Sequence, residues 1–212
     1  MLKRVGRNVS LGWLFFGAML LDILLWSFVL VRVESVNVPK NLRNMADVTF
    51  DFPYSHGLAA SLAWSIAMLV VGWVIWSRSS RRLVNALVLA AAVFSHFVLD
   101  WLVHGPELPV MGHGSRLLGF GLWRILPLAW GVEIALVGSG LWVFLKTQPL
   151  HGCRKVALIA GMTVVLIMTI RGQASSSAPP SIAAMAGTSL AFITLVVWFG
   201  WWVDRGHEKS RD

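Results

Sequence analysis

Six long apolar blocks constrain the fold of this 212-residue chain more than any other feature of its sequence. Because a helix rises about 1.5 Å per residue, a block of roughly 20 apolar residues crosses the hydrocarbon core of a bilayer. Only 13% of the residues are charged, against roughly a quarter in soluble domains. The sequence therefore predicts a single all-α membrane domain over residues 1–212, a six-transmembrane-helix bundle. The predicted helices cover residues 9–33, 57–77, 83–104, 121–145, 156–171 and 181–203.

The basic residues between these blocks predict how the bundle is oriented. Lysine and arginine are enriched in cytoplasmic loops. Most of the 18 such residues lie before the first block, after the last one, or in the second-to-third and fourth-to-fifth connections. Both termini of this multi-pass protein are therefore predicted in the cytoplasm (N-in/C-in). This topology accounts for the net charge of +8, so we expect no nucleic-acid partner.

Ionisable side chains inside the predicted helices are the main signal of function. Each costs at least ~2.5 kcal/mol near the bilayer centre, so each needs a partner or a role. Asp22 alone is as well explained by hydrogen bonding between helices as by function. The whole set, however, gathers toward one side of the bundle and favours a functional cavity there. Its members are Asp22, His96, Asp100, Arg124 and Glu133, with Glu34, His56, His104 and Glu107 at the mouth.

The strongest local pattern is His96-x-x-x-Asp100-x-x-x-His104 in the third predicted helix. Residues four apart lie on the same helix face, one turn above another. The two histidines are then about 12 Å apart, too far to bind one ion, because ligand bonds are near 2 Å. Neighbouring members of the pattern can share an ion if another helix adds a ligand. His56, at the start of the second predicted helix, is the expected donor.

Several short segments together resemble a group of small bacterial membrane proteins. The Ser-His and Ser-His-x-x-x-Asp elements are also similar to the inner-membrane family described as membrane-bound metal-dependent hydrolases. This resemblance implies that His56, His96 and Asp100 are metal ligands. The segments are Phe52-Pro-Tyr-Ser-His-Gly57, Ser95-His-Phe-Val-Leu-Asp-Trp-Leu-Val-His104, Gly105-Pro-Glu-Leu-Pro109 and Gly119-Phe-Gly-Leu-Trp123, while Glu34, His104 and Glu107 match the smaller group only.

From these residues we expect a metal-dependent hydrolase whose site faces away from the cytoplasm. Imidazole and carboxylate ligands suit Zn²⁺ best, and Fe or Mn less well. Such an ion lowers the pKa of a bound water towards ~7 and makes hydroxide available. Since a site buried among helices is reached from lipid, we expect a lipid-like ester or phosphoester substrate.

Other polar residues receive supporting roles in this hypothesis. His104 is either a fourth ligand or a proton shuttle. Glu34 or Glu133 is the general base or a hydrogen-bond partner of a ligand. Arg124 contacts an anionic group, such as a phosphate.

Two other functions fit the same residues. Chains of intramembrane Asp, Glu and His also form proton relays in transporters, although the cytoplasmic half of this bundle carries few of them. The third interpretation is a non-enzymatic membrane subunit or assembly factor. Separately, Ala183, Gly187 and Ala191 repeat every four residues and predict close packing of helix 181–203, either within the chain or in a homodimer.

Overall fold

The computed structural model describes residues 9–148, 150 and 152–208, with side chains up to Asp204. It confirms the predicted all-α fold with six helices that are long and apolar enough to cross a membrane. The stretches of mean hydropathy from 1.7 to 2.1 within these helices are typical of lipid-spanning segments. The helices are α2 (Leu11–Leu30), α3 (Leu58–Ile75), α4 (Arg82–Val103), α5 (Leu126–Thr147), α6 (Gly152–Gln173) and α7 (Ile182–Glu208).

Three helix boundaries differ by four or five residues from those predicted from the sequence, and one of them is the end of α7, at Glu208 rather than at residue 203. The expected helix 156–171 is longer, since α6 has 22 residues and carries Arg171 in its last turn. The expected helix 121–145 begins later, because Gly121 has a left-handed conformation (φ 76°) and a 3₁₀ turn, η2 (Leu122–Arg124), follows it. Proline in the first turn of α5 then starts a new helix. The prediction that Arg124 lies inside a membrane helix is therefore wrong.

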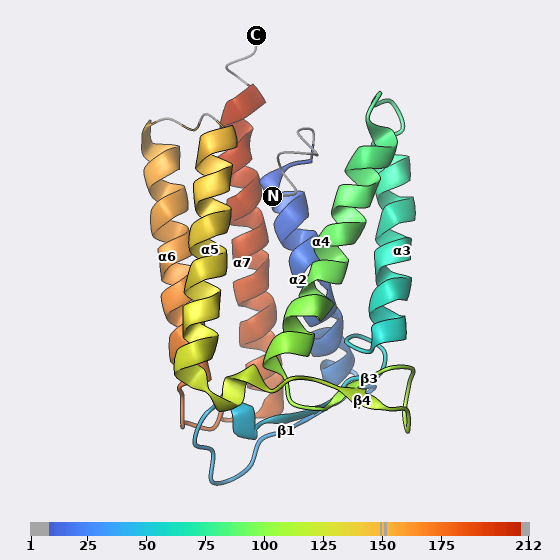
Figure 1. Ribbon diagram of the computed structural model, residues 1–212, viewed down its shortest axis with the longest axis vertical. Coiled ribbons are helices and arrows are strands. Elements are labelled where there is room, and N and C mark those ends of the chain that lie inside the picture. The colour runs from blue at the N-terminus through green and yellow to red at the C-terminus, as the bar shows by residue number, and fades with distance from the viewer. Residues whose placement is uncertain (1–8, 149, 151, 209–212) are drawn as a thin grey trace.

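The six helices form one bundle, in which α2 begins and α7 ends at the same end (Figure 1). We call this the terminal end, and the opposite one the loop end. Helix α2 packs against both α4 and α7, and α3 packs against α4. The fully buried side chains of Leu21, Leu89 and Val93 form the centre of the core. Helices α5 and α6 bury few residues, so their apolar side chains face outward.

Glycines allow α2 and α7 to approach each other closely. A Cβ atom on Gly200 would lie 3.0 Å from the Cα of Gly12, so larger residues would push the two helices apart. The predicted small-residue face of the last helix is different. Ala183, Gly187 and Ala191 are exposed, and nothing lies within 4 Å of a Cβ built on Gly187. Its predicted role in packing within the chain is therefore wrong, whereas its role in a homodimer stays a prediction.

Two small hairpins cover the loop end of the bundle (Figure 1). In the first, β1 (Ser35–Asn37) pairs antiparallel with β2 (Thr49–Asp51), and a 3₁₀ turn, η1 (Met45–Asp47), lies between them. In the second, β3 (Leu108–Pro109) pairs antiparallel with β4 (Leu117–Leu118).

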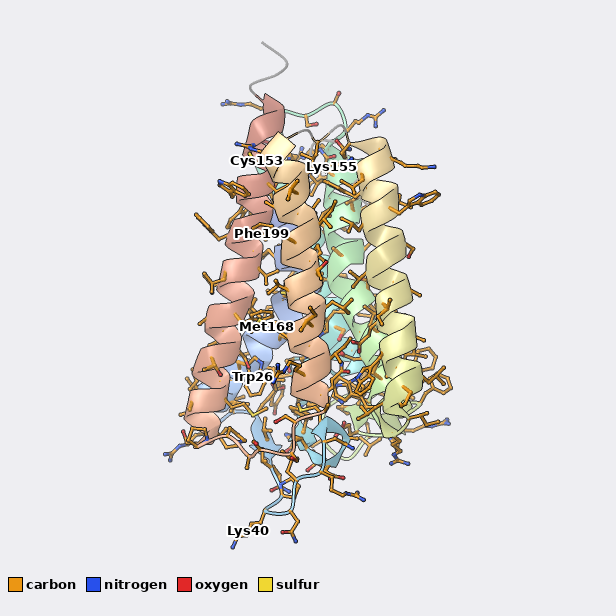
Figure 2. The ribbon with its side chains drawn as sticks, turned by 90° about the vertical axis from the view of Figure 1, so that its left-hand side faces the viewer. Trp26, Lys40, Cys153, Lys155, Met168 and Phe199 are labelled. Atoms are coloured by element: carbon orange, nitrogen blue, oxygen red, sulfur yellow. The ribbon has the colours of Figure 1, made fainter. Side chains whose placement is uncertain are left out.

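The side chains differ between the two ends of the bundle. Lys40 extends from the tip of the loop end, whereas Cys153 and Lys155 lie near the terminal end (Figure 2). The polar residues predicted to have a function gather at the loop end, beneath the hairpins. The hairpins therefore cover the site.

Candidate metal centre

Four ionisable side chains converge beneath the hairpins. Asp22 comes from α2, His56 from the turn before α3, and His96 and Asp100 from consecutive turns of α4. They meet because α2 and α3 both pack against α4. The expected convergence of His56, His96 and Asp100 is observed, and Asp22 joins them.

The atoms of this centre are closely and evenly spaced. The Nε2 atoms of His56 and His96 are 3.3 Å apart, and they lie 3.4 and 3.1 Å from Oδ2 of Asp100. The Oδ1 atom of Asp22 lies 3.6 and 3.7 Å from the same two nitrogens. A tetrahedral ion with bonds near 2.05 Å separates its ligand atoms by roughly 3.3 Å. The spacing therefore fits a metal ion, and Asp22, His56 and His96 alone already form a group that could hold one.

The backbone fixes the tautomer of His96. Its Nδ1 lies 2.6 Å from the carbonyl oxygen of Ala18. Because a carbonyl oxygen only accepts hydrogen bonds, Nδ1 carries the proton. The lone pair of neutral His96 is then on Nε2, the atom that faces the centre.

A buried carboxylate fixes His56 in the same way, through a serine. The backbone N–H groups of Tyr54 and Ser55 donate to Oε1 of Glu34, and the Ser55 hydroxyl lies 2.6 Å from Oε2. Since that carboxylate takes the only hydroxyl proton, the serine oxygen accepts from Nδ1 of His56, 2.8 Å away. The Nε2 atom of His56 therefore also presents its lone pair. Such hydrogen bonds are typical of histidines that bind metals.

These tautomers leave the centre short of a positive charge. If both rings are neutral, two nitrogen lone pairs face each other at 3.3 Å, beside the carboxylate of Asp100. With both rings neutral, the buried Oδ2 atom of Asp100 accepts no hydrogen bond from the described residues. A buried acceptor without a partner is costly. A cation bound between Asp22, His56, His96 and Asp100 would satisfy all of these groups, and this donor set suits Zn²⁺.

The centre lies in a cavity of about 180 Å³ with largely apolar walls. Trp26 lines this cavity, and Figure 2 shows it in the half of the bundle nearer the loop end. Apolar walls with a few convergent polar groups are typical of ligand sites. The other lining residues are Leu25, Met45, Phe50, Phe52, His104 and Trp123.

His104 lies beside the centre and is not one of its four closest members. It ends α4, and its Nδ1 lies 2.6 Å from Oε1 of Glu107. Its Nε2 is 4.0 Å from Oδ1 of Asp100, and the ring of Trp123 lies 4.5 Å away between centroids. Asp22, rather than His104, completes the group of four. The position of His104 suits a proton carrier.

Two other predicted residues lie outside this cavity. Glu133 does not line it, and its Oε1 accepts a hydrogen bond from Gln173 at the end of α6. Of the two carboxylates expected as general base or as hydrogen-bond partner of a ligand, Glu133 therefore lies away from the centre. Arg124 lines a neighbouring cavity. Among the described residues it forms no ion pair with Asp100 or Glu34.

Sequence reasoning missed three parts of the centre. Asp22 was assigned no ligand role, although its depth in the first helix matches that of His96. Ser55 was noted only as part of a Ser-His pair. The Ala18 carbonyl carries no signal in the sequence, because any residue has one.

No protein-family model, curated protein or solved structure matches this chain. The resemblance to membrane-bound metal-dependent hydrolases therefore stays a prediction from short motifs. The function proposed below depends on the geometry of the centre.

Proposed function

We propose that the protein is a membrane-embedded hydrolase that depends on a divalent metal ion, with Zn²⁺ the best fit. The observation that supports this most directly is the spacing of the two Nε2 atoms and the neighbouring carboxylate oxygens, which matches that of ligands around a tetrahedral ion. A hydrolase also needs an open coordination position, so not all four side chains can be permanent ligands. His56, His96 and Asp100 would hold the ion.

Asp22 acts on the water at the open position. Its side chain is 36% exposed, against 13% for Asp100, and it lies farther from the histidine nitrogens. A metal ion held there would supply the lowered pKa of that water. The carboxylate of Asp22 accepts the water proton as oxygen adds to the ester carbon or phosphorus. The ester bond then breaks, and the proton passes to the leaving alkoxide, either directly or through His104.

The surroundings favour a membrane-associated substrate. The cavity is walled by apolar side chains and lies within the span of the helices. The basic connections at the terminal end favour a cytoplasmic location for that end. The cavity then opens toward the outer side of the bacterial inner membrane, where a lipid-like ester enters from the bilayer.

Hydrolysis assays on the detergent-solubilised protein test this proposal. We expect the protein to cleave p-nitrophenyl esters or p-nitrophenyl phosphates, to lose this activity with a chelator, and to regain it with Zn²⁺, Mn²⁺ or Fe²⁺. His113→Ala, at an exposed histidine outside the cavity, is the matched control for His96→Ala. Cleavage that survives both the chelator and His96→Ala would overturn the proposal.

Bound metal without any hydrolysis would favour the non-enzymatic subunit instead. Proton-coupled flux into liposomes, abolished by Glu133→Gln, would favour the transporter. Among the described residues, Glu133 has only Gln173 as a hydrogen-bond partner, and it does not line the cavity, which gives this second alternative little support.

A further inference from the structure

A second cavity, of about 200 Å³, adjoins the metal centre at the loop end. Met45 and Trp123 line both cavities, so the two spaces share these side chains as a common wall. The second cavity has a different chemistry, because its wall carries the guanidinium group of Arg124. Its remaining lining residues are Ala46, Val48, Thr49, Val103, Gly105, Pro106, Glu107 and Gly121.

The Arg124 side chain lies close to two glycines, Gly105 and Gly121. A Cβ atom at Gly105 would lie 3.4 Å from Nη2 of Arg124, and one at Gly121 would lie 3.5 Å from its Nε. A Cβ atom at either position would be in ordinary van der Waals contact with the Arg124 side chain. Within the described part of the chain, this group has neither an ion pair nor a side-chain hydrogen bond. Its donors are therefore available to a ligand.

Trp123 supplies a second donor without a partner. Its indole N–H is buried and forms no hydrogen bond with the described residues. An indole N–H can only donate, and leaving it unpaired is unfavourable. Since the residue lines both cavities, a ligand oxygen between them would satisfy this group.

The acidic residues nearby already have partners. Oε1 of Glu107 lies against His104, and its Oε2 accepts the backbone N–H of Phe50. Asp47 forms an ion pair with Arg43, and this guanidinium lowers the pKa of Asp47 to about 2. Neither carboxylate neutralises Arg124.

We propose that this second cavity binds a phosphate group of the substrate, held by the guanidinium of Arg124 and the indole N–H of Trp123. Guanidinium groups bind phosphate oxygens through paired, charge-assisted hydrogen bonds. The inference rests on the proposed hydrolase, because it places this phosphate next to the bond that is cleaved at the metal centre. The substrate is then a phosphorylated compound, either a phospholipid-like molecule or a soluble phosphate.

Binding measurements by calorimetry in detergent test the subsite with two probes, inorganic phosphate and dihexanoyl phosphatidic acid. We expect the wild type to bind at least one probe, and Arg124→Gln to weaken that binding by about tenfold or more. Trp123→Phe, which keeps an aromatic ring and removes the N–H, should weaken it less. Arg116→Gln, at an exposed arginine of the same end that lines neither cavity, should bind like the wild type.

The choice of probe identifies the source of the phosphate. Binding of phosphatidic acid alone indicates a lipid headgroup, whereas binding of both indicates recognition of the phosphate itself. The proposal is overturned if neither probe binds, or if Arg124→Gln and Arg116→Gln bind equally well.

Metal content measured on the same samples separates this inference from the proposed hydrolase. If the protein contains metal but its phosphate binding does not depend on Arg124, the proposed phosphate subsite is contradicted and the proposed hydrolase is not. If the protein contains no metal but its phosphate binding depends on Arg124, the phosphate subsite is supported and the proposed metal-dependent hydrolase is contradicted.

Discussion

At the scale of single residues, the hydrogen bond between Ser55 and Glu34 decides which nitrogen of His56 faces the centre. A carboxylate can only accept, so the serine hydroxyl must donate to it and accept from the histidine. The metal-binding form of His56 thus depends on a residue more than twenty positions earlier in the chain. Glu34 is buried and is a positioning residue in this account.

The Glu34→Gln variant tests this role. The new amide can donate to the Ser55 oxygen, so the hydroxyl would turn to donate to Nδ1 of His56. The proton of His56 would then move to Nε2 and block the metal. We expect metal affinity to fall by about 10- to 100-fold, as measured by competition with a chelator. Asp51→Asn, at an exposed carboxylate of β2, should leave the affinity unchanged. Equal metal affinities in the two variants would contradict the proposed role of the Glu34–Ser55–His56 hydrogen bonds.

The two carboxylates of the centre should respond differently to removal of their charge. Asp100→Asn should lose most of the bound metal, because a ligand is removed. Asp22→Asn should keep the metal and lose hydrolysis, because the proton acceptor is removed. Metal content and turnover measured side by side check this. Loss of metal in both variants would make Asp22 a ligand as well.

Part of the centre was predictable at this scale. The spacing of His96 and Asp100 places them on one helix face whatever the fold, and the Ser-His segment placed His56 at the same end. The contributions of Asp22 and of the Ala18 carbonyl could not be predicted, because they depend on how α2 packs against α4. The spacing of residues within one helix does not indicate which other helix will pack against a given face.

At the scale of elements, the loop between α4 and α5 shapes the wall between the two cavities. Gly119 has φ 147°, and a Cβ atom there would lie 1.8 Å from the carbonyl oxygen of Gly105. Only glycine fits this close approach of two backbone segments. The turn that follows delivers Trp123 and Arg124 to the second cavity.

Gly119→Ala should therefore distort this loop. We expect a lower thermal unfolding temperature and weaker metal binding, because His104 and Trp123 would shift with the backbone. Gly131→Ala, where nothing lies within 4 Å of the new methyl group, is the matched control and should unfold like the wild type. If Gly119→Ala unfolds at the wild-type temperature, the close approach is not a constraint on the fold.

The same loop explains a boundary that sequence reasoning misplaced. Residues 121–125 are apolar apart from Arg124, so hydropathy extended the helix through them. The left-handed Gly121 and the proline in the first turn of α5 interrupt that helix. Hydropathy measures preference for lipid and does not distinguish a helix from an apolar turn beneath a hairpin. The other five spans were placed within a few residues, because length and apolar composition define them.

At the scale of the whole molecule, the centre and both cavities lie toward one end of the bundle. The terminal end carries basic residues such as Lys155 (Figure 2). The account therefore requires that this end faces the cytoplasm. Topology was predicted from charge alone, and the bundle itself has no property that fixes it.

Reporter fusions test the orientation. A fusion after residue 212 should report the cytoplasm, and one inserted near Asn44, beside η1, should report the opposite side. The reverse result would place the cavities on the cytoplasmic side and change the substrates that can reach them.

The central claim is that Asp22, His56, His96 and Asp100 surround a metal ion. Elemental analysis of the purified protein tests it most directly, with His96→Ala compared with His113→Ala. We predict about one equivalent of zinc, or of manganese or iron, in the wild type and in His113→Ala, and little in His96→Ala. A wild-type protein without metal, or equal metal in the two variants, would contradict the account.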